Sequence, residues 1–521
     1  MDKFEGIREY HDGLAVSDYV NMIPLGDTCI DRLGDKLAQV NGLSTKSEVR
    51  GVFVDSLNNI YVAVGSTLFI SRVGLDGRPG PMSRMNTMRN GSVEEFALTG
   101  TDKVTFCESS VKPTIMFCCD GTFIYQWNTT SNPLPTHPER DPYLVNAMYL
   151  PGIEVPESGR SGTEPDMNKY VDGDSSDFDI IPDMQSFAKS ICWFDNKLVM
   201  LKRGTTIVWI SCTDPGQFYR SAEQNPFYPI SGIPLWNSWY SSTNSSDTLV
   251  DIASYGGQLY FLNTHSIEIW GRTGNEDAPI QSNTTQVIHF GGRSPKIVEG
   301  NLYVIGRDTV GHEFVGMFSP QGFSRITNPE MEQRMGSPIG MELMAQRHEN
   351  YLFVHCKRGS GFLFKNGRWS SWKSPSGESD PVLCSVIDNF AVTLYGNITE
   401  FDNLSRRTND GSLIERYIRE GFEQFKKRVI FRKIECVMDT GKRTDWQDPS
   451  VAPDGKDVYV ALSTNRGLSF SQRHYRSLGK AGENNKSMIW RNLGSGNSVL
   501  LEIGSASTHI LQIYDLSIDI Q

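Results

Sequence analysis

The chain has 521 residues, a formal net charge of −11 and 11% aromatic residues, with 48 glycines and 25 prolines. This composition is typical of a folded, turn-rich β protein and argues against a disordered chain. The first residues lack a basic segment followed by an apolar core, so we expect no secretory signal, and no apolar run is long enough to span a membrane. Nine cysteines without C-x-x-C spacing favour reduced thiols.

Charge is distributed unevenly along the chain. Residues 1–400 hold 32 Lys and Arg against 46 Asp and Glu, a net charge of −14. Residues 401–521 hold 18 against 15, a net charge of +3. Because proteins that bind nucleic acid tightly usually present a basic surface, we expect no tight DNA binding.

Hairpins dominate the chain in sequence order. Residues 1–45 are polar and weakly patterned, with helix character around 31–40. From residue 50 onward, apolar residues alternate with polar ones and Asn, Asp or Gly marks each turn. The hairpins occupy residues 51–71, 114–127, 191–211, 249–270, 296–319, 349–372 and 384–402.

The spacing of these hairpins predicts the fold class. Their turns recur about every 40 to 60 residues apart from one long gap, which is the repeat length of propeller blades. A single hairpin leaves one apolar face exposed to solvent, and radial stacking of several hairpins buries that face. We therefore predict an all-β protein with a β-propeller over residues 46–405, built from six blades with the terminal segments sharing a blade.

Two segments interrupt the pattern. In residues 128–189, Pro, Gly, Ser and Asp replace the hairpin signal, which indicates either a solvated loop or an insertion projecting from the propeller. Residues 214–247 are rich in aromatics, a composition that suits a subunit contact or packing at a blade edge.

Beyond residue 405 the strand spacing changes. Residues 413–427 fit either an amphipathic helix or strands interrupted at Gly421. Later apolar segments read as strands of a separate domain. We predict a β-sandwich-like platform domain over residues 406–521, joined by the N-terminal segment 1–45.

The amino-acid sequences of two segments resemble those of a known family. These are SIEIWGRTGNEDAPI, residues 266–280, and ALSTNRGLSFSQRHYRSLGKAGENNKSMIWRNLG, residues 461–494. Both are similar to the packaged-DNA-stabilisation or tail-nozzle proteins of short-tailed bacteriophages, and the resemblance extends roughly over residues 45–521. It favours strands for 413–427. It also implies a structural virion protein without catalysis or cofactor.

The resemblance further implies a setting and partners. In that family, several copies, six in the usual case, form a ring below the portal-bound adaptor that retains packaged DNA and conducts it during ejection. The implied partners are further copies of the chain, the adaptor, tail fibres or spikes, a plug or needle protein, and double-stranded DNA passing through without sequence specificity. The implied location is the virion tail, assembled in the host bacterial cytoplasm.

A basic run in the C-terminal region is a candidate interface. Its members are Arg466, Arg473, Arg476, Lys480, Lys486 and Arg491. Three interpretations remain open: a solvated turn region, an electrostatic contact with an acidic neighbour, or contact with DNA phosphates. The contact with a neighbour, either another copy or an upstream ring, is the one we predict.

An acidic run in the 128–189 insertion is a candidate lining of the ring lumen. Its members are Glu154, Glu157, Glu164, Asp166, Asp172, Asp174, Asp177, Asp179 and Asp183. An acidic wall repels phosphates within about 8 to 10 Å at physiological salt and so keeps a moving duplex centred. We expect this insertion to lie near the distal tube.

Other motifs have plainer interpretations. Residues 463–470 resemble the Asp-box hairpin of sialidase propellers, with Asn465 in the Asp position, and we interpret it as a folding device. His348, His355 and Cys356 fit no metal-binding pattern. The alternative functions are a tail protein whose propeller binds or cleaves glycans and a cytosolic scaffold.

Overall fold

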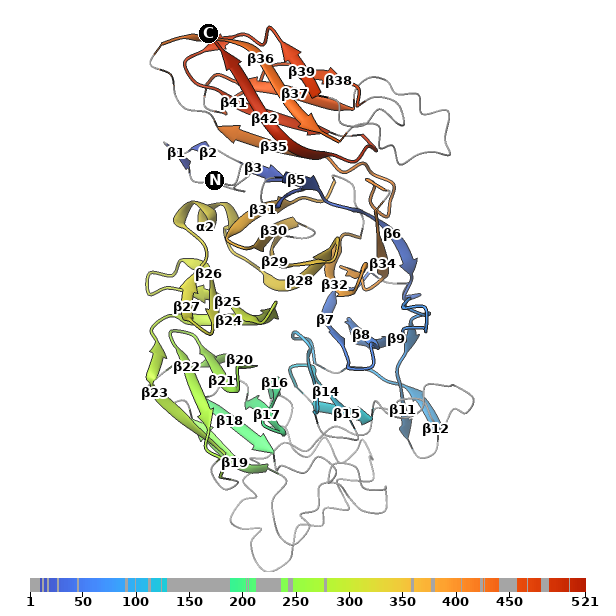
Figure 1. The fold of residues 1–521 in the computed structure, drawn as a ribbon. Helices are drawn as coiled ribbons and strands as arrows, with labels where there is room; N and C mark the ends of the chain where they lie inside the picture. Colours follow the sequence, from blue (N-terminus) through green and yellow to red (C-terminus); the bar gives the residue numbers. More distant parts are fainter. Residues whose placement is uncertain are drawn as a thin grey trace, which may run out of the picture. The chain divides into compact units, whose positions relative to one another are not determined.

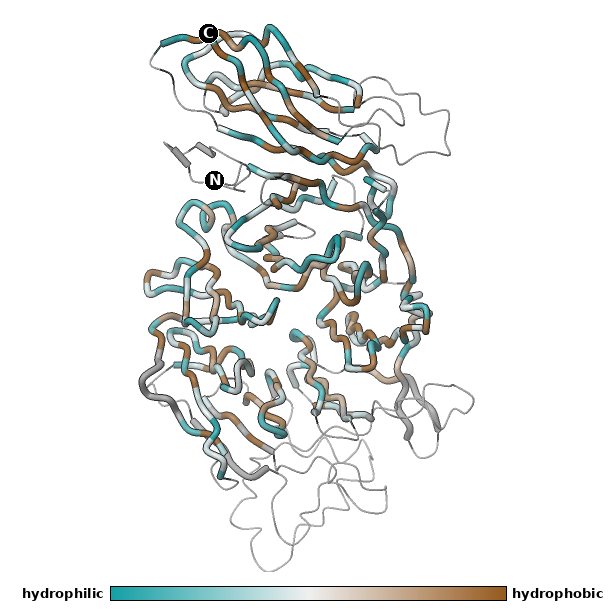
Figure 2. Tube along the Cα trace, in the orientation of Figure 1, coloured by the Kyte–Doolittle hydropathy of each residue, from teal (hydrophilic) through white to brown (hydrophobic). Residues whose placement is uncertain are grey.

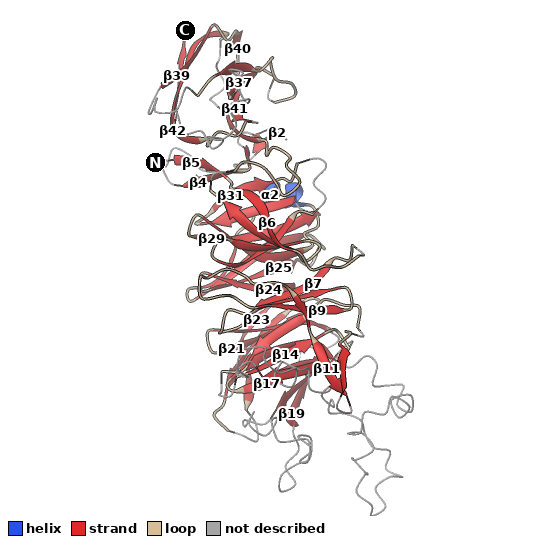
Figure 3. Cartoon of the chain, turned by 90° about the vertical axis from the view of Figure 1, so that its right-hand side faces the viewer, coloured by secondary structure: helices blue, strands red, loops and turns tan. Residues whose placement is uncertain are grey.

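A computed structural model describes residues 10–128, 188–211, 236–241, 247–439, 457–478 and 487–521, apart from gaps of one to four residues within these ranges. Strands make up nearly all of the regular structure in these ranges (Figure 3). Their one helix is α2 (Pro329–Met335), and they contain no helix long and apolar enough to cross a membrane. The all-β expectation is confirmed.

The chain divides into two compact units, Gln39–Ser324 and the combination of Met1–Ala38 with Arg325–Gln521. The unit Gln39–Ser324 contains five successive antiparallel sheets of three or four strands (Figure 1). In chain order the sheets are β7 (Val49–Val54), β8 (Ile60–Val64), β9 (Thr67–Ser71) and β10 (Ser83–Arg84); β13 (Thr105–Glu108), β14 (Ile115–Cys119) and β15 (Ile124–Asn128); β16 (Ala188–Phe194), β17 (Lys197–Lys202), β18 (Ile207–Ser211) and β19 (Trp236–Ser241); β20 (Leu249–Tyr255), β21 (Gln258–Asn263), β22 (Ile267–Arg272) and β23 (Ile280–Ile288); and β24 (Gly291–Val298), β25 (Asn301–Arg307), β26 (Glu313–Ser319) and β27 (Gly322–Arg325). A two-stranded ribbon, β11 (Asn86–Arg89) with β12 (Ser92–Glu95), lies between the first and second sheets in sequence.

Local turn chemistry explains why these hairpins form. Asn58 and Asn196 have φ angles of 62° and 59°, the left-handed conformation that Asn tolerates in tight turns. Asp55 accepts hydrogen bonds from the backbone N–H groups of Leu57 at 2.9 Å and Asn59 at 2.8 Å, which fixes the first turn. Every residue of β8 is buried, so both faces of that strand are covered by protein.

Polar contacts link several of the successive sheets in this unit. The Ser56 hydroxyl donates to Glu108 at 2.6 Å, and Ser190 donates to Asp251 at 2.9 Å. Further along, the Tyr255 hydroxyl donates to the Gly300 carbonyl at 2.9 Å. Adjacent sheets are therefore joined by directional bonds as well as by apolar packing.

The other unit contains the remaining sheets (Figure 1). A nine-stranded sheet runs in the order β28 (Gly340–Gln346), β29 (Glu349–Lys357), β30 (Ser360–Lys365), β31 (Arg368–Trp372), β3 (Asp18–Val20), β35 (Arg416–Gly421), β41 (Leu500–Ser505), β37 (Val458–Ser463) and β38 (His474–Arg476). A four-stranded sheet consists of β32 (Val382–Ile387), β33 (Phe390–Thr393), β34 (Ile398–Asp402) and β6 (Gly34–Gln39). A six-stranded sheet is made by β39 (Ser487–Arg491), β36 (Val429–Met438), β42 (Gln512–Ile520), β5 (Thr28–Asp31) and β4 (Met22–Leu25), with β40 (Ser495–Gly496) also paired to β36. A separate ribbon pairs β1 (Tyr10–His11) with β2 (Leu14–Ala15).

One large apolar core fills the C-terminal part of this unit. Alternate residues of β35, β41 and β37 face alternate residues of β36 and β42, and the cluster includes Ile418, Ile503 and Trp490. Apolar and polar residues are interspersed along this part of the chain in Figure 2, and every residue of β37 and β41 is buried. Residues 416–421 form a strand, which confirms the strand interpretation of 413–427 over the helical one.

Six separate sheets of three or four strands occur in the described chain, and the further set β28 to β31 forms one end of the nine-stranded sheet. The seventh hairpin, β32 to β34, forms a full sheet because the N-terminal strand β6 supplies its fourth strand. The terminal segments therefore do share a blade, as predicted. The helix expected around residues 31–40 is absent, because pairing with β34 holds residues 34–39 in an extended conformation.

The N-terminal segment is anchored by a buried ionic cluster. Asp31 is fully buried and accepts from Arg406 Nε at 2.7 Å, Arg416 Nη1 at 2.6 Å and Arg347 Nη2 at 3.1 Å. The Leu511 N–H donates to the same carboxylate at 3.0 Å. Burial alone would raise the pKa of Asp31, but Arg406 and Arg416 lower it below its usual value. Burial in turn lowers the pKa of Arg416 to about 10.

Asp35 lies four residues further along and has weaker partners. It is 3.9 Å from Arg32 and accepts from the Asn409 N–H at 3.2 Å. Burial raises its pKa to about 6 against the opposing effect of Arg32. The guanidinium of Arg32 is 4.0 Å from the ring centroid of buried Trp372, so much of the charge of Arg32 faces an indole.

Candidate functional site

The predicted basic interface residues occupy different environments. Arg473 directly precedes β38, Arg476 ends β38 and Arg491 ends β39, and all three are exposed. Arg466, Lys480 and Lys486 lie outside the described residues. The role of this run in an interface stays a prediction.

Arg473 is held within its own chain. Its guanidinium donates to Glu415 Oε1 at 2.8 Å and lies 3.5 Å from Glu502 Oε1. It also stacks 4.1 Å from the ring centroid of Tyr459. Its charge is therefore partly compensated before any partner arrives.

A second arginine on the nine-stranded sheet also binds Glu502, so the two arginines form a row of charged and aromatic side chains with their partners. Arg419 donates to Glu502 Oε2 at 2.8 Å and lies 4.7 Å from the ring centroids of both Tyr417 and Phe470. Gly504 makes room for the row, because a Cβ there would lie 2.6 Å from Tyr459 Oη and 2.7 Å from the Arg416 carbonyl. Alternating arginines, aromatics and glutamates thus cover this face of the sheet.

Strand pairing gathers a different set of cations on the six-stranded sheet. Lys427, Arg428, Arg432 and Arg491 are exposed, and we call them the basic patch. Arg491 pairs in register with Lys433, the Arg432 carbonyl accepts from the Asn492 N–H at 3.2 Å, and Arg428 Nε donates to Ser495 Oγ at 2.9 Å. The segment KKRVIFRK, residues 426–433, contains three of these cations, and the predicted interface run 466–491 contains only Arg491.

The predicted lumen residues cannot be placed. Glu154, Glu157, Glu164, Asp166, Asp172, Asp174, Asp177, Asp179 and Asp183 all fall in the segment 129–187, outside the described residues. Most of the aromatic segment 214–247 falls there as well. The lumen role stays a prediction.

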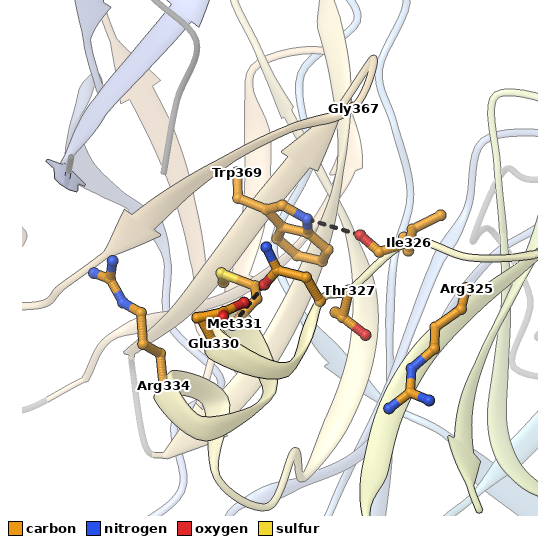
Figure 4. A pocket seen from close by; sticks show the side chains of 9 residues that line it. Arg325, Ile326, Thr327, Glu330, Met331, Arg334, Gly367 and Trp369 are labelled. Atoms are coloured by element: carbon orange, nitrogen blue, oxygen red, sulfur yellow. Dashed lines mark hydrogen bonds between the residues drawn. The ribbon is translucent and has the colours of Figure 1, made fainter. Parts of the chain in front are cut away.

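A pocket of about 240 Å³ lies beside α2, with the Trp369 indole in its wall (Figure 4). The Trp369 indole N–H donates to the Ile326 carbonyl at 3.2 Å. The two arginines at its rim have carboxylate partners: Arg325 reaches Glu332 at 2.6 Å and Arg334 reaches Asp18 at 2.6 Å. These contacts brace α2 and give the pocket no surplus charge from its arginines.

A second pocket of about 460 Å³ lies between two successive sheets of the unit Gln39–Ser324. Its floor contains Gly291 and Gly292, where an added Cβ would lie 1.9 Å from the Thr264 carbonyl and 2.9 Å from Ile267 Cδ1. The Gly-Gly pair in the sequence is therefore a packing requirement between sheets. In the wall, Arg293 donates to Glu313 at 2.9 Å.

The structure also places the remaining motifs that the sequence singled out. His355 is buried on β29, whereas His348 is exposed in the preceding turn, and no group of three potential metal ligands occurs among the described residues. The Asn465 side chain accepts from the Ser469 N–H at 3.0 Å, so the box-like hairpin acts as a folding device as interpreted.

Comparison with solved structures finds weak overall likeness. Virginiamycin B lyase from Staphylococcus aureus is 11% identical with a TM-score of 0.39, covering 70% of this chain and 98% of the lyase. A β-propeller domain from Myceliophteria thermophila is 9% identical with a TM-score of 0.40, covering 71% and 100%. Scores this low support no argument about function.

Comparison by sequence is more specific. No curated protein matches the chain significantly. Residues 166–366, which include the strands from β16 to β30, match one family model. That match makes this part of the chain similar to a phage-stabilisation family, described as the β-propeller of bacteriophage P22 Gp10.

Proposed function

We propose that the chain is a structural protein of a short-tailed phage tail that assembles into a ring, retains packaged DNA and conducts it during ejection. The match of residues 166–366 to the phage-stabilisation β-propeller family carries this proposal. A propeller fold alone would not carry it, because propellers serve many functions.

The charge of the chain is compatible with this role. A ring around a moving duplex has to avoid strong phosphate binding, and residues 1–400 have a net charge of −14. A closed ring of identical chains needs a head-to-tail contact between two different surfaces of each copy. A predominantly acidic region and a more basic C-terminal region supply two such surfaces in one chain.

The proposal is tested on phage particles. Antibodies to the chain should label the tail in electron micrographs, and particles made without the protein should lose their packaged DNA. Cryo-electron microscopy of the labelled tail should then show a closed ring of this chain. Absence of the protein from purified particles, or full DNA retention without it, would refute the proposal.

A glycan assay addresses the alternative. Of the two pockets described above, the one of about 460 Å³ falls in the size range of about 300 to 1,000 Å³ that is usual for small-molecule sites. Measurable binding or cleavage of host surface glycans by a monomeric protein would favour the glycan-binding or glycan-cleaving reading over a ring.

A further inference from the structure

The basic patch has the composition of a protein-docking surface. Lys427, Arg428, Arg432 and Arg491 have no carboxylate partner within the ranges that the structure describes, unlike Arg473 and Arg419 nearby in the same unit. Neighbouring Lys433 is neutralised by Glu435 at 2.7 Å. The charge of the patch is therefore available to an external partner.

An apolar residue stands within the patch. Ile430 lies between Arg428 and Arg432 on β36 and is 54% exposed, and Ile520 on the adjacent strand is 39% exposed. The backbone of Ile430 is fixed by two hydrogen bonds to Gln521, at 2.8 and 3.0 Å. An exposed isoleucine flanked by arginines matches the apolar core and polar rim of a protein–protein interface. A nucleic-acid phosphate backbone would make no favourable apolar contact with this isoleucine.

We propose that the basic patch docks on a carboxylate-bearing surface of a second copy of this chain. Charge complementarity selects that occupant, because residues 1–400 of every copy carry a net charge of −14 whereas the patch is cationic. This inference rests on the proposed ring and names one side of its subunit contact. It adds Lys427, Arg428 and Arg432 to the contact predicted for the run 466–491, and Arg491 belongs to both sets.

The size of the patch is compatible with this role. Arg428 and Arg432 are four residues apart, and the strand rise limits their separation along the chain to about 13 Å. Arg491 lies on β39, directly across from β36. Two or three carboxylates on a facing surface can meet these cations together, and such contacts mainly raise the rate and selectivity of association.

The experiment compares two double variants of the full chain. Arg428→Glu with Arg432→Glu reverses the patch, and Lys103→Glu with Lys373→Glu makes the same charge change at exposed lysines elsewhere. Self-association is measured by sedimentation velocity at low and high salt, with circular dichroism as a check on folding. A single variant, Ile430→Ala, tests the apolar centre without changing charge.

The wild type and the lysine variant should self-associate at low salt and dissociate as salt rises. The patch variant should associate at least about tenfold more weakly, and Ile430→Ala should weaken association at both salt concentrations. Equal association of the patch variant, or a wild type that does not associate at low salt, overturns the proposal.

A duplex-DNA mobility-shift assay separates the other occupant. Loss of DNA binding in the patch variant with self-association unchanged would identify phosphate as the ligand and overturn the proposal. The ring proposal is judged separately, by the presence of the protein in phage tails. A ring that persists in particles carrying the patch variant would therefore refute the proposed position of this contact and leave the ring proposal standing.

Discussion

Two aspartates in the N-terminal segment should affect stability in opposite directions. Asp31 accepts four hydrogen bonds and has a lowered pKa, so the folded state favours its charged form. Asp35 has a pKa raised to about 6 from 3.8, so its folded form favours the neutral state. Asn is the matched substitution at both positions, because it keeps the shape and one acceptor oxygen while removing the charge.

The magnitudes follow from these environments. Asp31→Asn leaves buried Arg406 and Arg416 without a counter-charge, a change that costs about 3 to 5 kcal/mol. For Asp35 the raised pKa amounts to 6 − 3.8, or about 2 units, and at about 1.4 kcal/mol per unit the charged form costs up to about 3 kcal/mol above pH 6. Asp35→Asn should therefore stabilise the protein at pH 7 by up to about 3 kcal/mol.

The two groups also differ in their dependence on pH. The stabilisation from Asp31 is present above its unfolded pKa of about 4 and is lost as pH falls further. The contribution of Asp35 is greatest below pH 4 and is lost as pH rises towards its folded pKa of about 6. The wild type should thus lose stability between pH 4 and pH 6 through Asp35, and Asp35→Asn should lack that loss.

Hydrogen exchange of peptides covering β5 and β6 is a suitable assay, because a chain with two compact units need not unfold in one step. Protection should fall at pH 7 in Asp31→Asn and rise in Asp35→Asn, each compared with the wild type at the same pH after correction for intrinsic exchange. Equal destabilisation by both substitutions, or wild-type protection that grows between pH 4 and pH 6, would refute the reasoning.

Three further outcomes are expected. Gly504→Ala should destabilise the protein by about 1 to 3 kcal/mol, because its Cβ meets Tyr459 Oη and a backbone carbonyl, whereas Gly340→Ala on the same sheet has no neighbour within 4 Å; denaturant midpoints that do not differ would contradict this. Reversing Arg473 and Arg476 to Glu together should block ring assembly. Thermal melting should distinguish the two single variants: Arg473→Glu should lower the melting temperature because its new carboxylate faces Glu415 and Glu502, whereas Arg476→Glu should leave it nearly unchanged. Replacing several acidic residues of 154–183 by Lys should leave assembly intact but slow DNA release from particles, and unchanged release kinetics would remove this segment from the lumen.

Sequence reasoning succeeded where local chemistry decides the structure. Asn196 occupies a tight turn because Asn tolerates a positive φ, and its neighbours alternate as strands do on either side. The box-like hairpin at Asn465 follows from hydrogen bonds within a few residues. These interactions depend only on residues that are close in sequence, so the pattern is sufficient to predict them.

The features that the sequence did not predict depend on residues far apart in the chain. Residues 34–39 carry no strong strand signal and become extended because β34, some 360 residues later in the chain, pairs with them. Likewise, the basic run looked uniform in sequence, yet Arg473 meets Glu502 across strands whereas Arg491 lies beside β36. The order of strands in a sheet decides which cations lie beside carboxylates of the same chain. That order is set by pairing between strands that are far apart in sequence.

The N-terminal segment shows how far such pairing determines the architecture. β3 lies between β31 and β35, β5 pairs with β42, and β6 completes the sheet of β32 to β34. Asn21, with a φ of 54°, donates to the carbonyls of Lys373 and Glu415 at 2.9 and 2.8 Å, so it fixes the chain between two of these pairings. The boundary predicted at residues 405 and 406 falls between β34 and β35, where the chain is continuous in sequence but both neighbours already depend on the first 39 residues. The final blade-type sheets and the C-terminal sheets therefore complete their hydrogen bonding together, and the carboxylate of Asp31 on β5 adds a side-chain link to Arg406 and Arg416.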